Sequence, residues 1–166
     1  TVFITTDTGA TWQNATVAPL PNRFVSAIAI SPSDPTLAYA VFNGFNTHTP
    51  QAPGHIFRTD DGGSSWVDIS GNLPDVPFLS IVLDRFSTDT IYLGSDAGVF
   101  RTRDAGGTWA PFNPWLPNVA VTDLKLSGDG TLLFAATYGR SIWRLRVAEA
   151  FAPTPIPPES QVFLPN

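Results

Sequence analysis

Thr102-Arg103-Asp104-Ala105-Gly106-Gly107-Thr108-Trp109 is one of three copies of a short phrase in this chain of 166 residues. The other copies are residues 5–12 (TTDTGATW) and residues 59–66 (TDDGGSSW). All three fit the pattern [Ser/Thr]-x-Asp-x-Gly-x-[Ser/Thr]-Trp. Self-similarity at a regular spacing is the sequence signature of a repeat architecture. The phrase therefore indicates the fold class before any other residue is considered.

Two further markers repeat in step with the phrase. Its tryptophans are spaced by 54 and then 43 residues. An aromatic residue that precedes each phrase recurs with spacings of 54, 43 and 43 residues. Leu-Pro followed by Asn or Asp occurs at 20–22, 73–75 and 116–118. A common period near 43 residues lies within the ~40–50 residues typical of propeller blades. The aromatic markers are Phe3, Phe57, Phe100 and Trp143.

Each repeat contains short segments with strand character. Apolar or alternating runs rich in β-branched residues are bounded by turn signals, and sixteen prolines and thirteen glycines exclude a long uninterrupted helix. Four short antiparallel strands in about 43 residues describe one propeller blade. The sequence thus predicts an all-β chain, a β-propeller of four-stranded blades. The predicted strands are 25–30, 79–83 and 121–126 (first), 37–42, 90–94 and 132–137 (second), 2–5, 55–59, 99–102 and 141–145 (third), and a fourth beginning at each repeated Trp.

The predicted strands do not complete a ring. They number about 13, or about 3 blades, whereas closed propellers have about four to eight. Free sheet edges and open apolar faces favour association. We therefore expect the remaining blades to come from a missing N-terminal segment, a companion chain or a second copy. The expected organisation is a partial propeller over 1–147, comprising a half-blade (1–17), two blades (23–70 and 78–113) and three last strands (119–147), followed by a proline-rich C-terminal tail (148–166).

The repeated phrase has the chemistry of a hairpin turn between the third and fourth strands. Its carboxylate can accept hydrogen bonds from the turn, and its glycine can adopt the positive φ that the turn requires. Its tryptophan is expected to pack in the seam between two sheets. We call these segments the aspartate turns and interpret them as structural. Their marker residues are Asp7, Gly9 and Trp12; Asp61, Gly63 and Trp66; and Asp104, Gly106 and Trp109.

With these turns the chain resembles the Asp-box, or bacterial neuraminidase repeat (BNR), family over residues 1–147. That family includes sialidases, sortilin-like receptors, xyloglucan-cleaving glycoside hydrolases and a photosystem assembly factor. In those relatives the motif is structural. The resemblance implies the C-terminal part of a larger propeller and an exported bacterial protein, secreted or at the cell surface.

Composition excludes several function classes. A net charge of −5 provides no basic face for nucleic acid. No run of ~18 apolar residues is present, so the sequence predicts no membrane-spanning helix. The absence of cysteine excludes disulfides and thiolate chemistry within the chain.

The extra residues of the longer repeat are the first candidate for ligand binding. They form an insert at about 44–54, between the second and third strands of their blade, on the face of a propeller that normally binds ligands. Phe45, Asn46 and His48 could contact a carbohydrate or a protein there, although a tolerated surface insertion is the simpler interpretation. Trp115 lies in a loop on the same face and could stack on a sugar ring, or instead cover a seam between blades.

Asp96 is the one candidate catalytic residue. The resemblance implies this role, because xyloglucan-cleaving relatives have a catalytic Asp in a similar loop. Glycoside hydrolysis, however, needs a second carboxylate ~5–9.5 Å from the first. No second acid is evident, and Gly-x-Asp-x-Gly is common turn chemistry. The arginine triad and Arg-Ile-Pro signature of sialidases are absent. Neither a metal site nor a cofactor is expected, since His48 and His55 lack supporting acidic ligands.

Together these features predict a non-catalytic binding or assembly module of an exported protein. The alternative is the C-terminal part of a secreted glycoside hydrolase, xyloglucanase-like or sialidase-like, whose catalytic groups lie mostly outside this chain.

Overall fold

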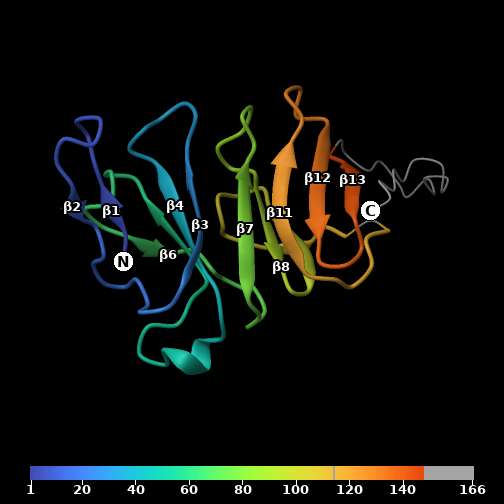
Figure 1. The fold of residues 1–166 in the computed structure, drawn as a ribbon, viewed down its shortest axis with the longest axis horizontal. Helices are drawn as coiled ribbons and strands as arrows, with labels where there is room; N and C mark the ends of the chain where they lie inside the picture. Colours follow the sequence, from blue (N-terminus) through green and yellow to red (C-terminus); the bar gives the residue numbers. More distant parts are fainter. Residues whose placement is uncertain (114, 148–166) are drawn as a thin grey trace.

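The strands form in the predicted order (Figure 1). The computed structural model describes residues 1–113 and 115–147, and within them it has thirteen strands and one short 3-10 helix. The predicted tail, 148–166, lies outside the described residues. The elements are β1 (Phe3–Ile4), β2 (Gln13–Asn14), β3 (Val25–Ile30), β4 (Ala38–Phe42), η1 (Asn46–His48), β5 (Ile56–Thr59), β6 (Val67–Asp68), β7 (Phe78–Leu83), β8 (Ile91–Ser95), β9 (Gly98–Thr102), β10 (Ala110–Pro111), β11 (Val121–Leu126), β12 (Leu132–Thr137) and β13 (Ile142–Arg146).

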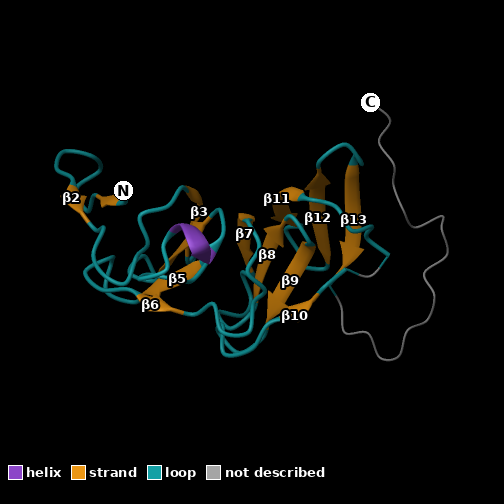
Figure 2. Ribbon diagram, turned by 90° about the horizontal axis from the view of Figure 1, so that it is seen from below, coloured by secondary structure: helices purple, strands orange, loops and turns teal. Residues whose placement is uncertain are grey.

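These strands form four antiparallel sheets in chain order. The N-terminal pair is β1–β2, sheet 1 is β3-β4-β5-β6, sheet 2 is β7-β8-β9-β10, and sheet 3 is β11-β12-β13. Figure 2 shows the sheets following one another from the N-terminal pair to β13, with η1 beside sheet 1. The innermost strands β3, β7 and β11 lie side by side. The all-β architecture of four-stranded blades is therefore confirmed.

Each innermost strand carries a β-bulge at the same place. The pairing with the second strand shifts between Val25 and Ala27, between Phe78 and Ser80, and between Val121 and Asp123. A bulge bends its strand and increases the local twist. In sheet 1 the bulged residue also links two sheets, because the Ser26 hydroxyl donates to the Phe78 carbonyl at 2.8 Å.

Apolar side chains fill the three seams between consecutive sheets. The seam between sheets 1 and 2 buries Tyr39, Ile56, Phe78 and Trp109. Tyr92, Leu124 and Leu133 fill the seam between sheets 2 and 3. The seam between the N-terminal pair and sheet 1 is filled mainly from Val2, Ala15, Phe42, Phe57 and Trp66. Stability therefore comes from sheet-to-sheet burial of apolar area, and each sheet depends on its neighbours.

The three aspartate turns share one hydrogen-bond pattern. In the second turn the Asp61 carboxylate accepts bonds from the Thr59 hydroxyl (2.8 Å), the Ser65 amide (2.9 Å) and the Ser65 hydroxyl (2.6 Å), while the Gly63 amide donates to the Thr59 hydroxyl (2.8 Å). The same four bonds recur around Asp7 and Asp104 at 2.6–3.0 Å. These bonds lower the pKa of all three carboxyls to about 2.

The tryptophans that end the turns differ in their surroundings. The indole Nε1 of Trp66 donates to the Ala15 carbonyl, and that of Trp109 donates to the Ile69 carbonyl, both at 2.9 Å. Each bond joins a sheet to the one before it. Trp66 and Trp109 are 5% and 4% exposed, whereas Trp12 is 61% exposed. Within the described residues no sheet precedes the N-terminal pair, so no neighbouring sheet buries the Trp12 side chain.

Candidate binding face

The loops between second and third strands lie on the face opposite the aspartate turns. Figure 1 shows this face at its lower edge, marked by η1. In each sheet, one backbone hydrogen bond joins this loop to the residue just before the innermost strand. The Asn43 amide donates to the Phe24 carbonyl at 2.9 Å in sheet 1. The corresponding bonds are Asp96 to Pro77 at 3.0 Å in sheet 2 and Tyr138 to Ala120 at 2.9 Å in sheet 3. This face therefore gathers the insert, the Asp96 turn and the loops between sheets.

The insert is closed at its base by polar contacts. The Arg23 guanidinium donates to the carbonyls of Gly44 and Gly54, at 3.2 Å for Gly44. The Asn46 side-chain oxygen accepts from the Gly54 amide at 2.9 Å, and the Asn46 amide donates to Asp75 at 2.8 Å. The insert is thus a closed loop with one turn of 3-10 helix. Asn46 is engaged in holding that loop together.

A buried histidine lies beneath the insert. His55 Nε2 lies 3.1 Å from Asp75 Oδ1, and its ring packs 5.1 Å from that of Phe78. Burial, and then the neighbouring Arg23 cation, lowers the pKa of His55. The neutral imidazole therefore donates from Nε2 to Asp75, and Nδ1 has no hydrogen-bond partner among the described residues.

Sequence reasoning missed this His55–Asp75–Arg23 group. Two signals pointed toward it. Asp75 is the one acidic residue at the third position of the Leu-Pro-Asn/Asp marker, where the other repeats have Asn22 and Asn118. Arg23, moreover, directly follows the first marker. The group comes from three separate segments, and only the fold brings them together.

The predicted aromatic contacts are exposed on two loops of this face. The rings of Phe45 and His48 form an edge-to-face pair with centroids 6.3 Å apart, and both side chains are exposed. Trp115 lies in the loop between β10 and β11, is 56% exposed and has φ +67°. Its neighbour Leu116, instead, is the residue buried in the seam. Exposed rings on such a face can stack on a ligand.

Asp96 lies in the β8–β9 turn with its side chain exposed. The turn is completed by Gly98 at φ +101° and by the Ala97 amide, which donates to the Ser95 hydroxyl at 3.1 Å. Asp123, on β11, lies 3.8 Å from Lys125. In residues 1–113 and 115–147, no cluster of three or more His, Asp or Glu side chains is arranged to hold a metal ion.

Solved structures share this arrangement of sheets. The GH74 enzyme of Niastella koreensis matches 73% of this chain with a TM-score of 0.59 and 18% identity, and the extracellular domain of the putative one component system BT4673 from B. thetaiotaomicron matches 86% with a TM-score of 0.60 and 16% identity. The fold is that of a β-propeller. YCF48 from Cyanidioschyzon merolae matches 81% of the chain, with a TM-score of 0.56 and 18% identity.

The matched propellers are much longer than this chain. The chain spans 19% of the Niastella enzyme, 17% of the BT4673 domain and 37% of YCF48. No protein-family model matches the sequence, and no curated protein matches it either. Among the described residues, no helix is long and apolar enough to span a membrane.

Proposed function

We propose that this chain is a non-catalytic Asp-box propeller module of an exported bacterial protein, secreted or at the cell surface, which completes its ring with further blades and binds its ligand on the face of the insert. The repeated hydrogen-bond pattern around Asp7, Asp61 and Asp104 supports the Asp-box assignment. The observation that carries the proposal is the exposure of the first repeat at the edge of the fold.

At that edge, the N-terminal pair covers only part of the apolar face of sheet 1. The N-terminal pair corresponds to the third and fourth strands of a blade, and it covers Phe57 and Trp66 on the outer part of sheet 1. Ile28 and Ile30 on the innermost strand β3 remain exposed. Two further strands beside β1 would cover them, and a preceding sheet would cover Trp12. Exposed apolar side chains that lie together on one face favour a partner.

Among the described residues, the last sheet, at the other end of the series, has an exposed outer surface as well. Sheet 3 has three strands within the described residues, and Phe134 and Ile142 on its outer surface are exposed. A fourth strand and a following blade would bury them. The two ends together fit a segment of a larger ring better than a closed domain.

The ligand-binding part of the proposal rests on Phe45, His48 and Trp115. Their rings are exposed on the face that carries the insert, and the Arg23 and Asn46 contacts close the insert at its base. A loop closed in this way binds with less loss of conformational entropy. A carbohydrate or a protein segment would fit such a surface.

A single cysteine can test the ring, because the chain has none of its own. Ile30→Cys should react with a maleimide as fast as the exposed control Thr88→Cys in a dilute solution of the chain. It should react at least about tenfold more slowly once the chain is concentrated or joined to the polypeptide carrying the other blades, since burial blocks the thiol. Equal labelling of the two cysteines in every preparation would contradict ring completion.

The glycoside-hydrolase alternative has one observation in its favour, the exposed carboxylate of Asp96 on the same face. The test is the release of reducing ends from xyloglucan by the protein with all its blades. We expect none, and we expect Asp96→Asn to leave binding unchanged. Hydrolysis by the wild-type protein that Asp96→Asn abolishes would overturn the non-catalytic assignment in favour of the enzyme.

A further inference from the structure

A pocket of about 410 Å³ opens between sheets 1 and 2 on the face of the aspartate turns. It lies between the β3–β4 loop and the β7–β8 loop, on the opposite face from the insert. We call it the seam pocket. Its polar lining includes Ser31, Ser33, Tyr39, Asp84, Thr88 and Asp89. The volume falls in the range of small-molecule sites, about 300–1,000 Å³.

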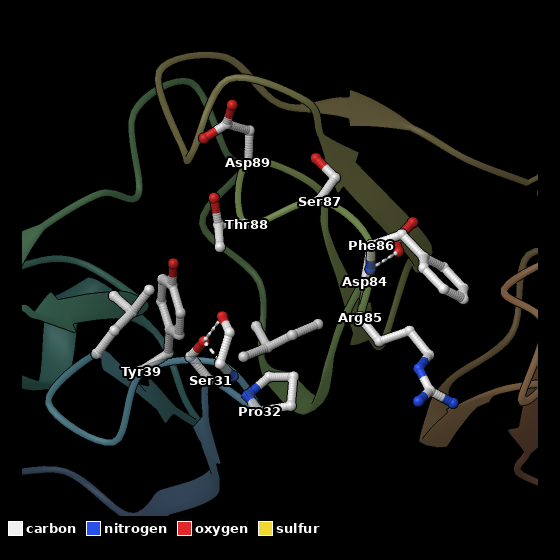
Figure 3. A pocket seen from close by; sticks show the side chains of 12 residues that line it. Ser31, Pro32, Tyr39, Asp84, Arg85, Phe86, Ser87, Thr88 and Asp89 are labelled. Atoms are coloured by element: carbon white, nitrogen blue, oxygen red, sulfur yellow. Dashed lines mark hydrogen bonds between the residues drawn. The ribbon is translucent and has the colours of Figure 1, made fainter.

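The floor of the seam pocket holds a buried hydroxyl without a protein partner. Tyr39 is 1% exposed, and no described residue lies within hydrogen-bond reach of its hydroxyl group. Figure 3 shows that hydroxyl directed toward Thr88 across the pocket. Buried polar groups are nearly always hydrogen-bonded. The Tyr39 hydroxyl is therefore positioned to bond to a molecule in the pocket.

The next repeat shows why Tyr39 is unpartnered. Tyr92 is its equivalent and pairs across strands with Arg101, which partly offsets the burial that raises the pKa of Tyr92. Tyr39 pairs with Arg58 in the same register, but Arg58 turns to Asp60, with Nε and NH2 bonds of 2.9 and 2.7 Å. Sheet 2 has Arg103 at the position of Asp60. Arg58 is thus engaged by Asp60, and the Tyr39 hydroxyl is left without a partner among the described residues.

The same comparison shows why the space is open. In the seam between sheets 2 and 3, Arg85 donates to the Gly128 carbonyl at 3.0 Å, and the Phe86 ring lies against Gly130. Figure 3 shows both side chains directed away from Tyr39. At the equivalent positions sheet 1 has the smaller Pro32 and Ser33. The seam between sheets 1 and 2 is consequently hollow.

The lining favours a ligand that is rich in hydroxyl groups and carries no negative charge. The Asp84 and Asp89 carboxylates accept hydrogen bonds, the Tyr39 hydroxyl can donate one, and the Ser31, Ser33 and Thr88 hydroxyls can do either. Arg85 also borders the pocket, but its guanidinium is directed away from Tyr39 and donates to the Gly128 carbonyl. Pro32, Leu37 and Leu83 provide apolar walls. We propose that the seam pocket binds a small neutral sugar, a mono- or disaccharide, with the Tyr39 hydroxyl as its buried hydrogen-bond donor.

Amide chemical shifts of the whole 166-residue chain test this proposal. The probes are glucose, galactose, mannose, xylose and cellobiose, with glucosamine and glucuronate as charged analogues. At least one neutral sugar should give saturable shifts confined to residues 31–39 and 83–89, with weaker binding of the charged analogues. No saturable shift with any neutral sugar, stronger binding of a charged analogue, or shifts confined to 44–54 would overturn it.

Matched variants connect the binding to the hydroxyl. Tyr39→Phe should weaken binding about tenfold or more, whereas the control Tyr92→Phe should leave it unchanged. Ser33→Phe, which places in sheet 1 the residue found at this position of sheet 2, should fill the exposed side of the pocket and abolish binding. Ser33 is exposed, so this variant tests the site even where Tyr39→Phe impairs folding. Wild-type affinity in Tyr39→Phe or Ser33→Phe would contradict the site.

Discussion

The indole nitrogen of Trp66 donates a hydrogen bond to the carbonyl of Ala15, 51 residues earlier in the chain, at 2.9 Å. Trp109 makes the equivalent bond to Ile69 one repeat later. Each aspartate turn therefore does more than connect two strands of its own sheet. It places a tryptophan against the preceding sheet, and this bond links each of these two sheets to the one before it.

Replacing these tryptophans should have unequal effects. Trp109→Phe leaves the partly buried Ile69 without the donor to its carbonyl, and we expect a loss of about 1–3 kcal/mol in the free energy of unfolding. Trp12→Phe, at the exposed edge, should change it by less than about 0.5 kcal/mol. Chemical denaturation of the two variants measures both values. Equal losses would show that the seam bond has no special role.

The neighbouring glycines of the second turn should also differ. Gly63 has φ +86°, and a Cβ at this position would meet the terminal methyl of Ile4 and crowd Ala15, so Gly63→Ala adds some crowding to backbone strain and should cost about 2 kcal/mol. Gly62 has φ +66° with open space around it, and the other turns have Thr8 and Ala105 there. Gly62→Ala should therefore cost only about 1 kcal/mol. Thermal unfolding of both variants gives the comparison, and the reverse order would contradict the turn geometry.

Stability should fall in acid because of the aspartate turns. The pKa of Asp7, Asp61 and Asp104 is about 2 in the folded chain, below the ordinary value of 3.8. A lowered folded-state pKa stabilises the fold above the ordinary value, and this stabilisation is lost as the pH falls from about 4 through about 2. Denaturation at a series of pH values from 2 to 6 measures the slope.

The triple variant Asp7→Asn, Asp61→Asn and Asp104→Asn should be less stable at neutral pH and show a flatter dependence on pH below 4. Repeating the series in 1 M salt is the control. Because hydrogen bonds within each turn cause the shift, the slope should persist when long-range charge interactions are screened. A slope that salt removes would assign the effect to general charge repulsion.

Arg23 should control the mobility of the insert. Its guanidinium bridges Gly44 and Gly54, so Arg23→Met removes both bonds while keeping an apolar stem. Amide exchange of residues 44–54 should become about tenfold faster or more, equivalent to about 1.4 kcal/mol of local stability. Arg85→Met, on the opposite face, is the matched control and should leave this exchange unchanged. Unaltered exchange in Arg23→Met would show that other contacts close the loop.

The sequence predicted the features that depend on local pattern. Strand positions follow from β-branched runs, and the turn bonds of Asp61 follow from the spacing of Thr59, Gly63 and Ser65. The 54–43 spacing located the insert. What the sequence did not predict depends on residues that meet only in the fold. His55 is held by Asp75 from another loop, and the seam pocket exists because Ser33 faces a hairpin that lies fifty residues further along the chain.

Solution mass tests the central proposal, an open propeller segment that needs further blades, most directly. Sedimentation of the whole 166-residue chain, followed over a range of concentrations, is the measurement. We predict association through the edge of Trp12 and Ile30, or, where the chain stays monomeric, low cooperativity of unfolding and binding of an apolar dye. A monodisperse monomer of 17.8 kDa that unfolds cooperatively and binds no dye would contradict the account.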